Sequence, residues 1–293
     1  MSSGVTAGLF PGQGSQTGDL RSQVARDAPE LLELCIELVG EDPFVRVAQS
    51  TRFAQPAIFC ASVASWMRLR EHVDPVALAG HSLGELSALV AAEALDPADG
   101  LALAVRRGEL MAAAGDGEEG MLALLGAAQD LPARLAEDHG VVVANDNAPG
   151  QVVLAGRLER LYEARDAVRA QGARAIMLDV AGAFHSPAMA GAVAPFRAAL
   201  EQVQLLEPVV PVICGWSARP FDDVREELAA AIVAPVRWRE AMLALAALGA
   251  EQFVDFGPGS VLAKLVRRNL PDARVIDPDE LAAPVAVGAG DGA

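Results

Sequence analysis

A serine lies between two glycines in residues 80–84, which read Gly-His-Ser-Leu-Gly. An apolar run of strand type, residues 76–79, precedes this segment, and apolar residues at helical spacing follow it. The pattern is typical of a nucleophile elbow, a strand-to-helix turn so tight that it requires glycines and exposes the serine hydroxyl. Short Gly-x-Ser-x-Gly matches also occur by chance. The flanking runs favour Ser82 as a nucleophile.

A serine hydroxyl needs a base within hydrogen-bond distance, and the chain has four histidines. His72 and His139 fall at polar helix ends, and the elbow directs His81 away from the serine. His185 follows Gly-Ala-Phe and precedes Ser-Pro, in a loop at the seam of two predicted units, where pockets form. We therefore predict His185 as the base, with a capping or packing histidine as the alternative. No acidic residue is suitably placed to orient it, so we expect a backbone carbonyl or a side-chain amide there.

Acyl transfer through Ser82 would also need two amides that stabilise an oxyanion. The amide of Leu83 is the first candidate, because it lies at the N-terminus of the predicted helix. The second is in residues 11–16, Pro-Gly-Gln-Gly-Ser-Gln, where glycines on both sides of Gln13 allow a close backbone approach. A plain glycine turn is the alternative for this loop.

Two arginines, Arg106 and Arg107, interrupt a helix predicted over residues 97–114 that is otherwise largely apolar. Burying an arginine on the inner face of this helix would cost free energy of folding unless the guanidinium paired with an anion. A carboxylate on the acyl group would satisfy it through a bidentate contact that lysine cannot match. The alternative is that one or both side chains extend to solvent.

Composition excludes several classes of protein. The chain has 293 residues, 52% of them hydrophobic, and a net charge of −16, which argues against a nucleic-acid partner. Its three cysteines are widely spaced in apolar stretches, so we expect buried thiols and no metal site. We find no signal-peptide pattern, and no apolar run approaches the roughly 20 residues of a membrane-spanning helix. We expect a cytoplasmic monomer that contacts neither nucleic acid nor membrane.

The order of predicted elements indicates an α/β fold in two units. Residues 1–117 and 182–281 alternate strands and helices, which predicts an α/β-hydrolase-like core with a parallel sheet. Within it, a helix over residues 55–72 would begin near Pro56, and a strand would cover residues 210–215. Residues 118–181 follow the order βαββαβ, which predicts an inserted ferredoxin-like subdomain. Residues 282–293, rich in Ala, Gly, Pro and Val, are expected to form a loose tail.

The motifs together resemble the malonyl-CoA:acyl-carrier-protein transacylase family, which includes the acyltransferase domains of polyketide synthases. The matching segments occur in family order at residues 11–16, 55–57, 80–85, 107–108, 147–156, 182–185, 235–238 and 256–259. The resemblance implies a ping-pong transfer in which Ser82 accepts a malonyl group from coenzyme A and passes it to the phosphopantetheine thiol of an acyl carrier protein. His185 would be the base, the amides of Gln13 and Leu83 would form the oxyanion hole, and Arg107 would hold the malonyl carboxylate. Coenzyme A enters as a substrate, and we expect no cofactor and no metal.

The resemblance carries three further implications. A main-chain carbonyl from residues 255–257 would orient the histidine. Phe184, directly before His185, would crowd an α-branched acyl group and so favour malonyl over methylmalonyl units. Because carrier proteins are acidic, we expect arginines that include Arg267 and Arg268 to gather near the mouth of the site.

Two other functions are compatible with the same nucleophile pattern. One is a hydrolase of the same fold that removes stalled acyl groups from carrier proteins, with water as the acceptor. The other is a partner-binding scaffold without activity, which the presence of both proposed catalytic residues and of the elbow glycines disfavours. Arg107 separates transferase from hydrolase, because a hydrolase of uncharged acyl groups gains nothing from a buried guanidinium.

Overall fold

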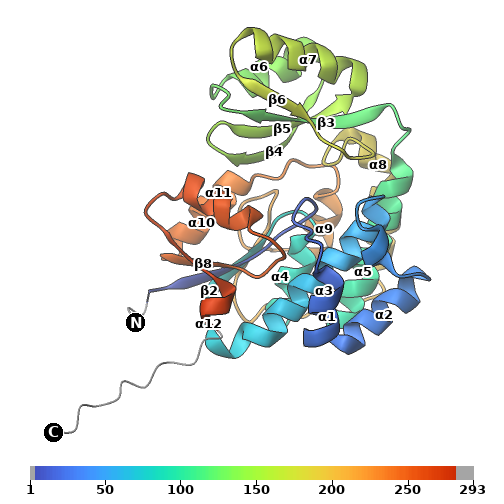
Figure 1. Ribbon diagram of the computed structural model, residues 1–293, viewed down its shortest axis with the longest axis vertical. Helices are drawn as coiled ribbons and strands as arrows, with labels where there is room; N and C mark the ends of the chain where they lie inside the picture. The colour runs from blue at the N-terminus through green and yellow to red at the C-terminus, as the bar shows by residue number, and fades with distance from the viewer. Residues whose placement is uncertain (1–3, 282–293) are drawn as a thin grey trace, which may run out of the picture.

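The computed structural model describes residues 4–281, which form two units, each with its own sheet (Figure 1). The larger unit has a five-stranded parallel sheet, and the smaller one has a four-stranded antiparallel sheet at the top of the view. This confirms the predicted α/β class. The tail predicted over residues 282–293 lies outside the described residues.

The parallel sheet has the strand order β7-β2-β1-β8-β9. Its strands are β1 (Thr6–Phe10), β2 (Pro75–Gly80), β7 (Val212–Ile213), β8 (Gln252–Asp255) and β9 (Arg274–Ile276). Alternate residues of β1 enter different hydrophobic cores: Leu9 packs on one face of the sheet and Phe10 on the other. Since both faces are buried, the central strands are almost entirely apolar. The strand predicted over residues 210–215 is correct in place but only two residues long.

Helices cover both faces of this sheet. On one face lie α3 (Thr51–Leu69), α4 (Gly84–Ala91) and α5 (Pro97–Ala114), and on the other lie α10 (Trp238–Ala247) and α11 (Val261–Asn269). The remaining helices are α1 (Leu20–Asp27), α2 (Pro29–Val39), α8 (Ala190–Leu200), α9 (Val224–Ala230) and α12 (Pro278–Leu281), with short 3-10 turns at Pro43–Arg46, Arg70–His72 and Pro187–Met189. None of the described helices combines the length and the hydropathy that crossing a bilayer requires.

Helix α3 begins earlier than the sequence indicated. The predicted start near Pro56 is wrong, because Ser50 caps the helix by accepting a hydrogen bond from the amide of Arg52. Pro56 lies inside the helix, near its N-terminal end. The earlier start places Thr51 and Gln55 one turn apart on the same helix.

The subdomain follows the predicted βαββαβ order. Its elements are β3 (Glu119–Leu125), α6 (Leu131–His139), β4 (Val142–Ala148), β5 (Gln151–Arg157), α7 (Leu158–Ala170) and β6 (Arg174–Met177). The sheet order β4-β5-β3-β6, with antiparallel pairing throughout, is that of a ferredoxin-like fold. A separate core that includes Leu122, Leu154 and Leu161 holds it together.

Hydrogen bonds join the edge strand β4 to the core. The amide of Val236 donates to the Ala144 carbonyl over 2.8 Å, and the amide of Asp146 donates to the Val236 carbonyl over 2.9 Å. The side chain of Asn147, at the end of β4, lies 2.8 Å from the His81 ring. The subdomain therefore sits over the end of β2 from which the elbow begins.

Candidate active site

The turn from β2 to α4 has the geometry of a nucleophile elbow. Ser82 has a φ of 55°, a left-handed conformation that is strained for a residue with a side chain. A Cβ atom at Gly80 would lie 2.0 Å from the Gly84 carbonyl carbon, and one at Gly84 would lie 1.9 Å from the Phe10 carbonyl oxygen. Both glycines are therefore required, since any larger residue would collide with backbone.

His185 lies directly against the serine. Its Nε2 atom is 2.7 Å from Ser82 Oγ, and its Nδ1 atom is 2.9 Å from the carbonyl oxygen of Ala231, just after α9. Because a carbonyl can only accept, Nδ1 carries the ring proton and Nε2 presents its lone pair to the hydroxyl. The histidine is thus oriented by a main-chain carbonyl, one of the two kinds of group expected.

The prediction that residues 255–257 supply this carbonyl is wrong, because the carbonyl belongs to Ala231. The carboxylate of Asp255 instead accepts hydrogen bonds from the amides of Gly257, Leu262 and Ala263 and so fixes the turn into α11. A Cβ at Gly257 would lie 1.8 Å from the Pro11 ring, so this turn packs directly against the loop that carries Gln13. Residues 255–257 therefore support that loop, and within residues 4–281 they form no hydrogen bond with the histidine side chain.

The environment of His185 keeps its imidazole neutral. Burial, together with the positive charge of Arg107, lowers the pKa of His185 to about 3. At neutral pH the ring is therefore unprotonated and able to accept a proton from Ser82.

Of the two neighbouring arginines, only Arg107 faces the site. Its Nη2 donates to Ser82 Oγ over 3.1 Å and its Nη1 to Gln55 Oε1 over 2.9 Å, while Arg106 is exposed and pairs with Glu109. Burial lowers the pKa of Arg107 to about 10, so the guanidinium remains charged at neutral pH. Within residues 4–281, no carboxylate lies within ion-pair distance of it. The cavity therefore contains a cation without an acidic partner.

A cavity of about 340 Å³ lies between the two units. All six residues predicted from the sequence line it: Gln13, Ser82, Leu83, Arg107, Phe184 and His185. Its apolar wall comes from both units and includes Met111, Met121, Val153, Leu178 and Val180. In the described part of the chain, the amides of Gln13 and Leu83 donate to no protein acceptor. A serine, a base, two free amides and a cation thus share one space.

Comparison with known proteins identifies the family. Residues 14–286 match the acyl transferase domain family. The chain belongs to this family. It is 34% identical to the polyketide biosynthesis malonyl CoA-acyl carrier protein transacylase PksC of Bacillus subtilis, over 92% of this chain and 98% of that protein. It is 38% identical to the polyketide biosynthesis protein ThaF of Burkholderia thailandensis, of which it spans only 25% of the length.

Solved structures of similar proteins support the same family. The crystal structure of a malonyl-CoA:acyl carrier protein transacylase from Xanthomonas oryzae is 32% identical, with a TM-score of 0.87, over 94% of this chain and 95% of that one. A malonyl-transacylase in complex with a type II polyketide synthase acyl-carrier protein is 31% identical, with the same TM-score, over 93% and 95%. The shared fold therefore extends over both units.

Sequence reasoning missed three contributors to the acyltransferase site. Ala231 acts through its main chain, so its side chain carries no signal. Gln55 received no role beyond its place in a motif, and Thr51 lies ahead of the helix that the sequence predicted. A signal was present, because Thr51 and Gln55 are polar residues four positions apart, which places them on the same face of a helix.

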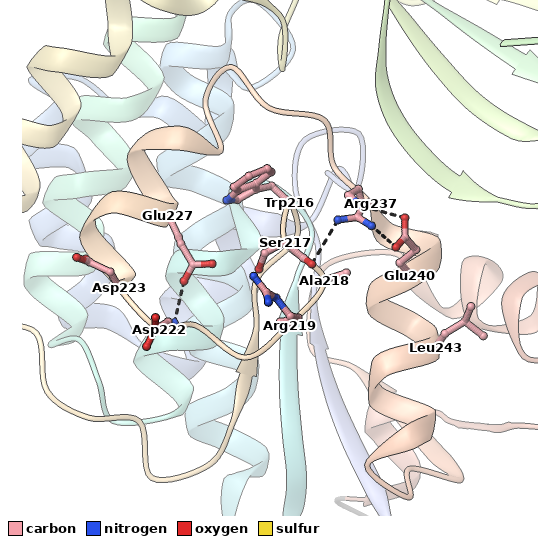
Figure 2. Close-up of a pocket in the computed structure, with 10 residues that line it drawn as sticks. All are labelled: Trp216, Ser217, Ala218, Arg219, Asp222, Asp223, Glu227, Arg237, Glu240 and Leu243. Carbon is pink, nitrogen blue, oxygen red and sulfur yellow. Dashed lines mark hydrogen bonds and ion pairs between the residues drawn. The ribbon is translucent and has the colours of Figure 1, made fainter. Parts of the chain in front are cut away.

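A larger surface groove, of about 740 Å³, is lined by none of the predicted site residues (Figure 2). Trp216 and Leu243 are its large apolar side chains. Within it, Arg237 forms an ion pair with Glu240, and the Glu227 carboxylate accepts from the amide of Asp222. The acyltransferase chemistry therefore belongs to the smaller cavity.

Proposed function

We propose that this acyltransferase moves a malonyl group from coenzyme A to the phosphopantetheine thiol of an acyl carrier protein, through an ester on Ser82. The observation that carries the proposal is the buried, unpaired guanidinium of Arg107, 3.1 Å from the hydroxyl that His185 contacts. A carboxylate on the acyl group is the ligand that this cation lacks. The relatives named malonyl CoA-acyl carrier protein transacylase support the same substrate.

In the first half-reaction, Ser82 Oγ attacks the thioester carbonyl while His185 Nε2 takes its proton. The amides of Gln13 and Leu83 stabilise the negative charge that develops on the carbonyl oxygen. When the carbon–sulfur bond breaks, the imidazolium returns its proton to the coenzyme A sulfur. The products are free coenzyme A and a malonyl ester on Ser82.

In the second half-reaction, His185 takes the proton of the carrier protein's thiol as the sulfur attacks the ester. Collapse of the intermediate breaks the bond to Ser82 Oγ, and the serine recovers its proton from the imidazolium. Arg107 holds the malonyl carboxylate through both steps. No step needs a metal or a bound organic cofactor, because His185 moves every proton and amides stabilise the charge.

Basic residues near the cavity would receive the carrier protein. Helix α11 contributes Leu262 and Leu265 to the cavity lining and presents Lys264, Arg267 and Arg268 to solvent. Arg268 donates to Gln151, itself a lining residue, over 2.7 Å. An acidic carrier protein would therefore meet a local positive charge despite the net charge of −16.

We propose a cytoplasmic location for the enzyme. The three cysteines are unpaired and buried, which fits a reducing compartment.

Intact-protein mass spectrometry tests the function. We expect a malonyl adduct after mixing with malonyl-CoA, its loss in Ser82→Ala, and its passage to holo carrier protein when that is added. Ser22→Ala, a change at an exposed serine in α1, is the matched control and should retain the adduct. Release of free malonate at the same rate with and without carrier protein would indicate the hydrolase. An adduct that persists in Ser82→Ala would refute the assigned nucleophile.

A further inference from the structure

A chain of side-chain hydrogen bonds connects the arginine to the loop of the proposed oxyanion hole. Arg107 Nη1 donates to Gln55 Oε1 over 2.9 Å, and Gln55 Nε2 donates to Thr51 Oγ1 over 3.0 Å. The Thr51 hydroxyl then donates to Gln13 Oε1 over 2.7 Å. Hydrogen bonds thus link Arg107, proposed to bind the malonyl carboxylate, to Gln13, whose amide is proposed to bind the thioester oxygen.

The direction of each hydrogen bond is determined. A guanidinium only donates, so it must face the oxygen end of the Gln55 amide, and the nitrogen end must then donate to Thr51. With its oxygen accepting from Gln55, the threonine gives its single proton to Gln13. All donors point the same way from a cation, an arrangement in which each hydrogen bond polarises and strengthens the next. Thr51 and Gln55 are each only 2% exposed, so water does not compete with the bonds that Gln55 makes to Arg107 and Thr51.

Thr51 is held from two sides. It begins α3 directly after the capping residue Ser50, so its backbone is fixed by the helix. Helix α5 packs onto it, since a Cβ at Gly108 would lie 2.9 Å from the Thr51 carbonyl oxygen. Gly108 directly follows Arg107, so the helix that carries the arginine also fixes the threonine.

The Gln13 side chain lies in a glycine-rich loop and is held by Thr51. Its neighbour Gly14 has a φ of 99°, and Gly12 lies so close to the elbow that a Cβ there would be 2.6 Å from the His81 carbonyl oxygen. Within residues 4–281, the hydrogen bond from Thr51 is the one that the Gln13 side chain makes. Ser15 Oγ also fixes this loop by donating to the Gly12 carbonyl over 2.8 Å, so the contact with Thr51 is what ties the Gln13 side chain to α3.

We propose that Thr51 is a positioning residue that couples the carboxylate-binding arginine to the oxyanion loop. A substrate carboxylate that fixes Arg107 also orders Gln55, Thr51 and Gln13, which directs the Gln13 amide at the thioester oxygen. The coupling rests on the proposed malonyl transfer, and it makes binding of the acyl carboxylate assist the acylation step.

The test is single-turnover formation of the Ser82 ester from malonyl-CoA. Thr51→Val keeps the shape and removes the hydroxyl, so we expect acylation to slow about 10- to 100-fold, part of the loss seen when an oxyanion donor is removed outright, with KM changed less than about threefold. Thr51→Ser retains the hydroxyl and should restore most of the rate. Thr6→Val, a change at a buried threonine outside the cavity, is the matched control and should behave as wild type.

A double-mutant cycle separates coupling from a packing defect. Gln13→Ala keeps the backbone amide but removes its anchor, so it should slow acylation as Thr51→Val does, and the double variant should be no slower than either single one. Additive losses, a Thr51→Ser variant as slow as Thr51→Val, or a wild-type rate in Gln13→Ala would each overturn the coupling. Since position 13 is exposed, the Gln13→Ala rate still tests the coupling even if Thr51→Val fails to fold. Failure of wild-type enzyme to form the ester would instead refute the proposed function.

Discussion

Replacing Arg107 with alanine should exchange one acyl specificity for another. The side chain is 4% exposed and contacts Ser82 Oγ and Gln55, with no carboxylate partner in the described chain. In the substrate complex its two nitrogens would hold the malonyl carboxylate. Acetyl-CoA lacks that carboxylate and so gains nothing from the guanidinium.

The magnitude follows from the two hydrogen bonds that alanine cannot donate to the carboxylate. A hydrogen bond to a charged group contributes about 1.5–3 kcal/mol, so two such bonds contribute about 3–6 kcal/mol. At about 1.4 kcal/mol per factor of ten, kcat/KM for malonyl-CoA should fall about 10²- to 10⁴-fold. The value for acetyl-CoA should stay constant or rise, because the pocket no longer contains a cation without a partner.

The fold should tolerate this change. Glu85 is buried near Arg107, and burial raises the pKa of its carboxyl to about 7 although Arg107 acts to lower it. Without the arginine that pKa rises further, so Glu85 takes up a proton and no unpaired buried charge is left behind. Circular dichroism and thermal unfolding would verify that the variant is folded.

The assay compares kcat/KM for malonyl-CoA and acetyl-CoA with the same carrier protein. Arg106→Ala, a change at the exposed neighbour that pairs with Glu109, is the matched control and should keep the wild-type ratio. A folded Arg107→Ala enzyme with the wild-type ratio of malonyl to acetyl transfer would refute the assigned role of the arginine.

Three further predictions concern the base, the elbow and the acyl pocket. Because the pKa of His185 is lowered to about 3, the imidazole stays neutral, and acylation by malonyl-CoA should be nearly constant between pH 7 and 5; a decline centred at the ordinary histidine value of about 6.5 would contradict this. Gly84→Ala would place a Cβ 1.9 Å from the Phe10 carbonyl oxygen and should lower the free energy of unfolding by about 3 kcal/mol or more in urea, whereas Gly18→Ala, whose Cβ would meet nothing within 4 Å, should not; equal effects would refute the steric argument. Phe184→Ser should raise the kcat/KM of methylmalonyl-CoA relative to malonyl-CoA about tenfold or more, the value of one methyl group in a pocket, and an unchanged ratio would show that the ring does not select the acyl group.

The local chain geometry of this protein could be predicted from its sequence. The spacing of Gly80, Ser82 and Gly84 identifies the elbow because steric exclusion acts between residues a few positions apart. The order of strands and helices likewise predicted a parallel sheet and a ferredoxin-like insertion, since hydrophobic periodicity is a local property. Errors occurred where the local signal was weak. Strand β9, three residues long, was not predicted, and Pro56 obscured the start of α3.

Only the tertiary structure decided how these pieces meet. Ser82 and His185 are 103 positions apart, and their 2.7 Å contact depends on how the segments before and after the inserted subdomain pack within the larger unit. The same packing turned Arg107 inward and Arg106 outward, a choice that the sequence left open. The carbonyl of Ala231 could not be predicted, because every residue carries a main-chain carbonyl and only the fold determines which one reaches the imidazole.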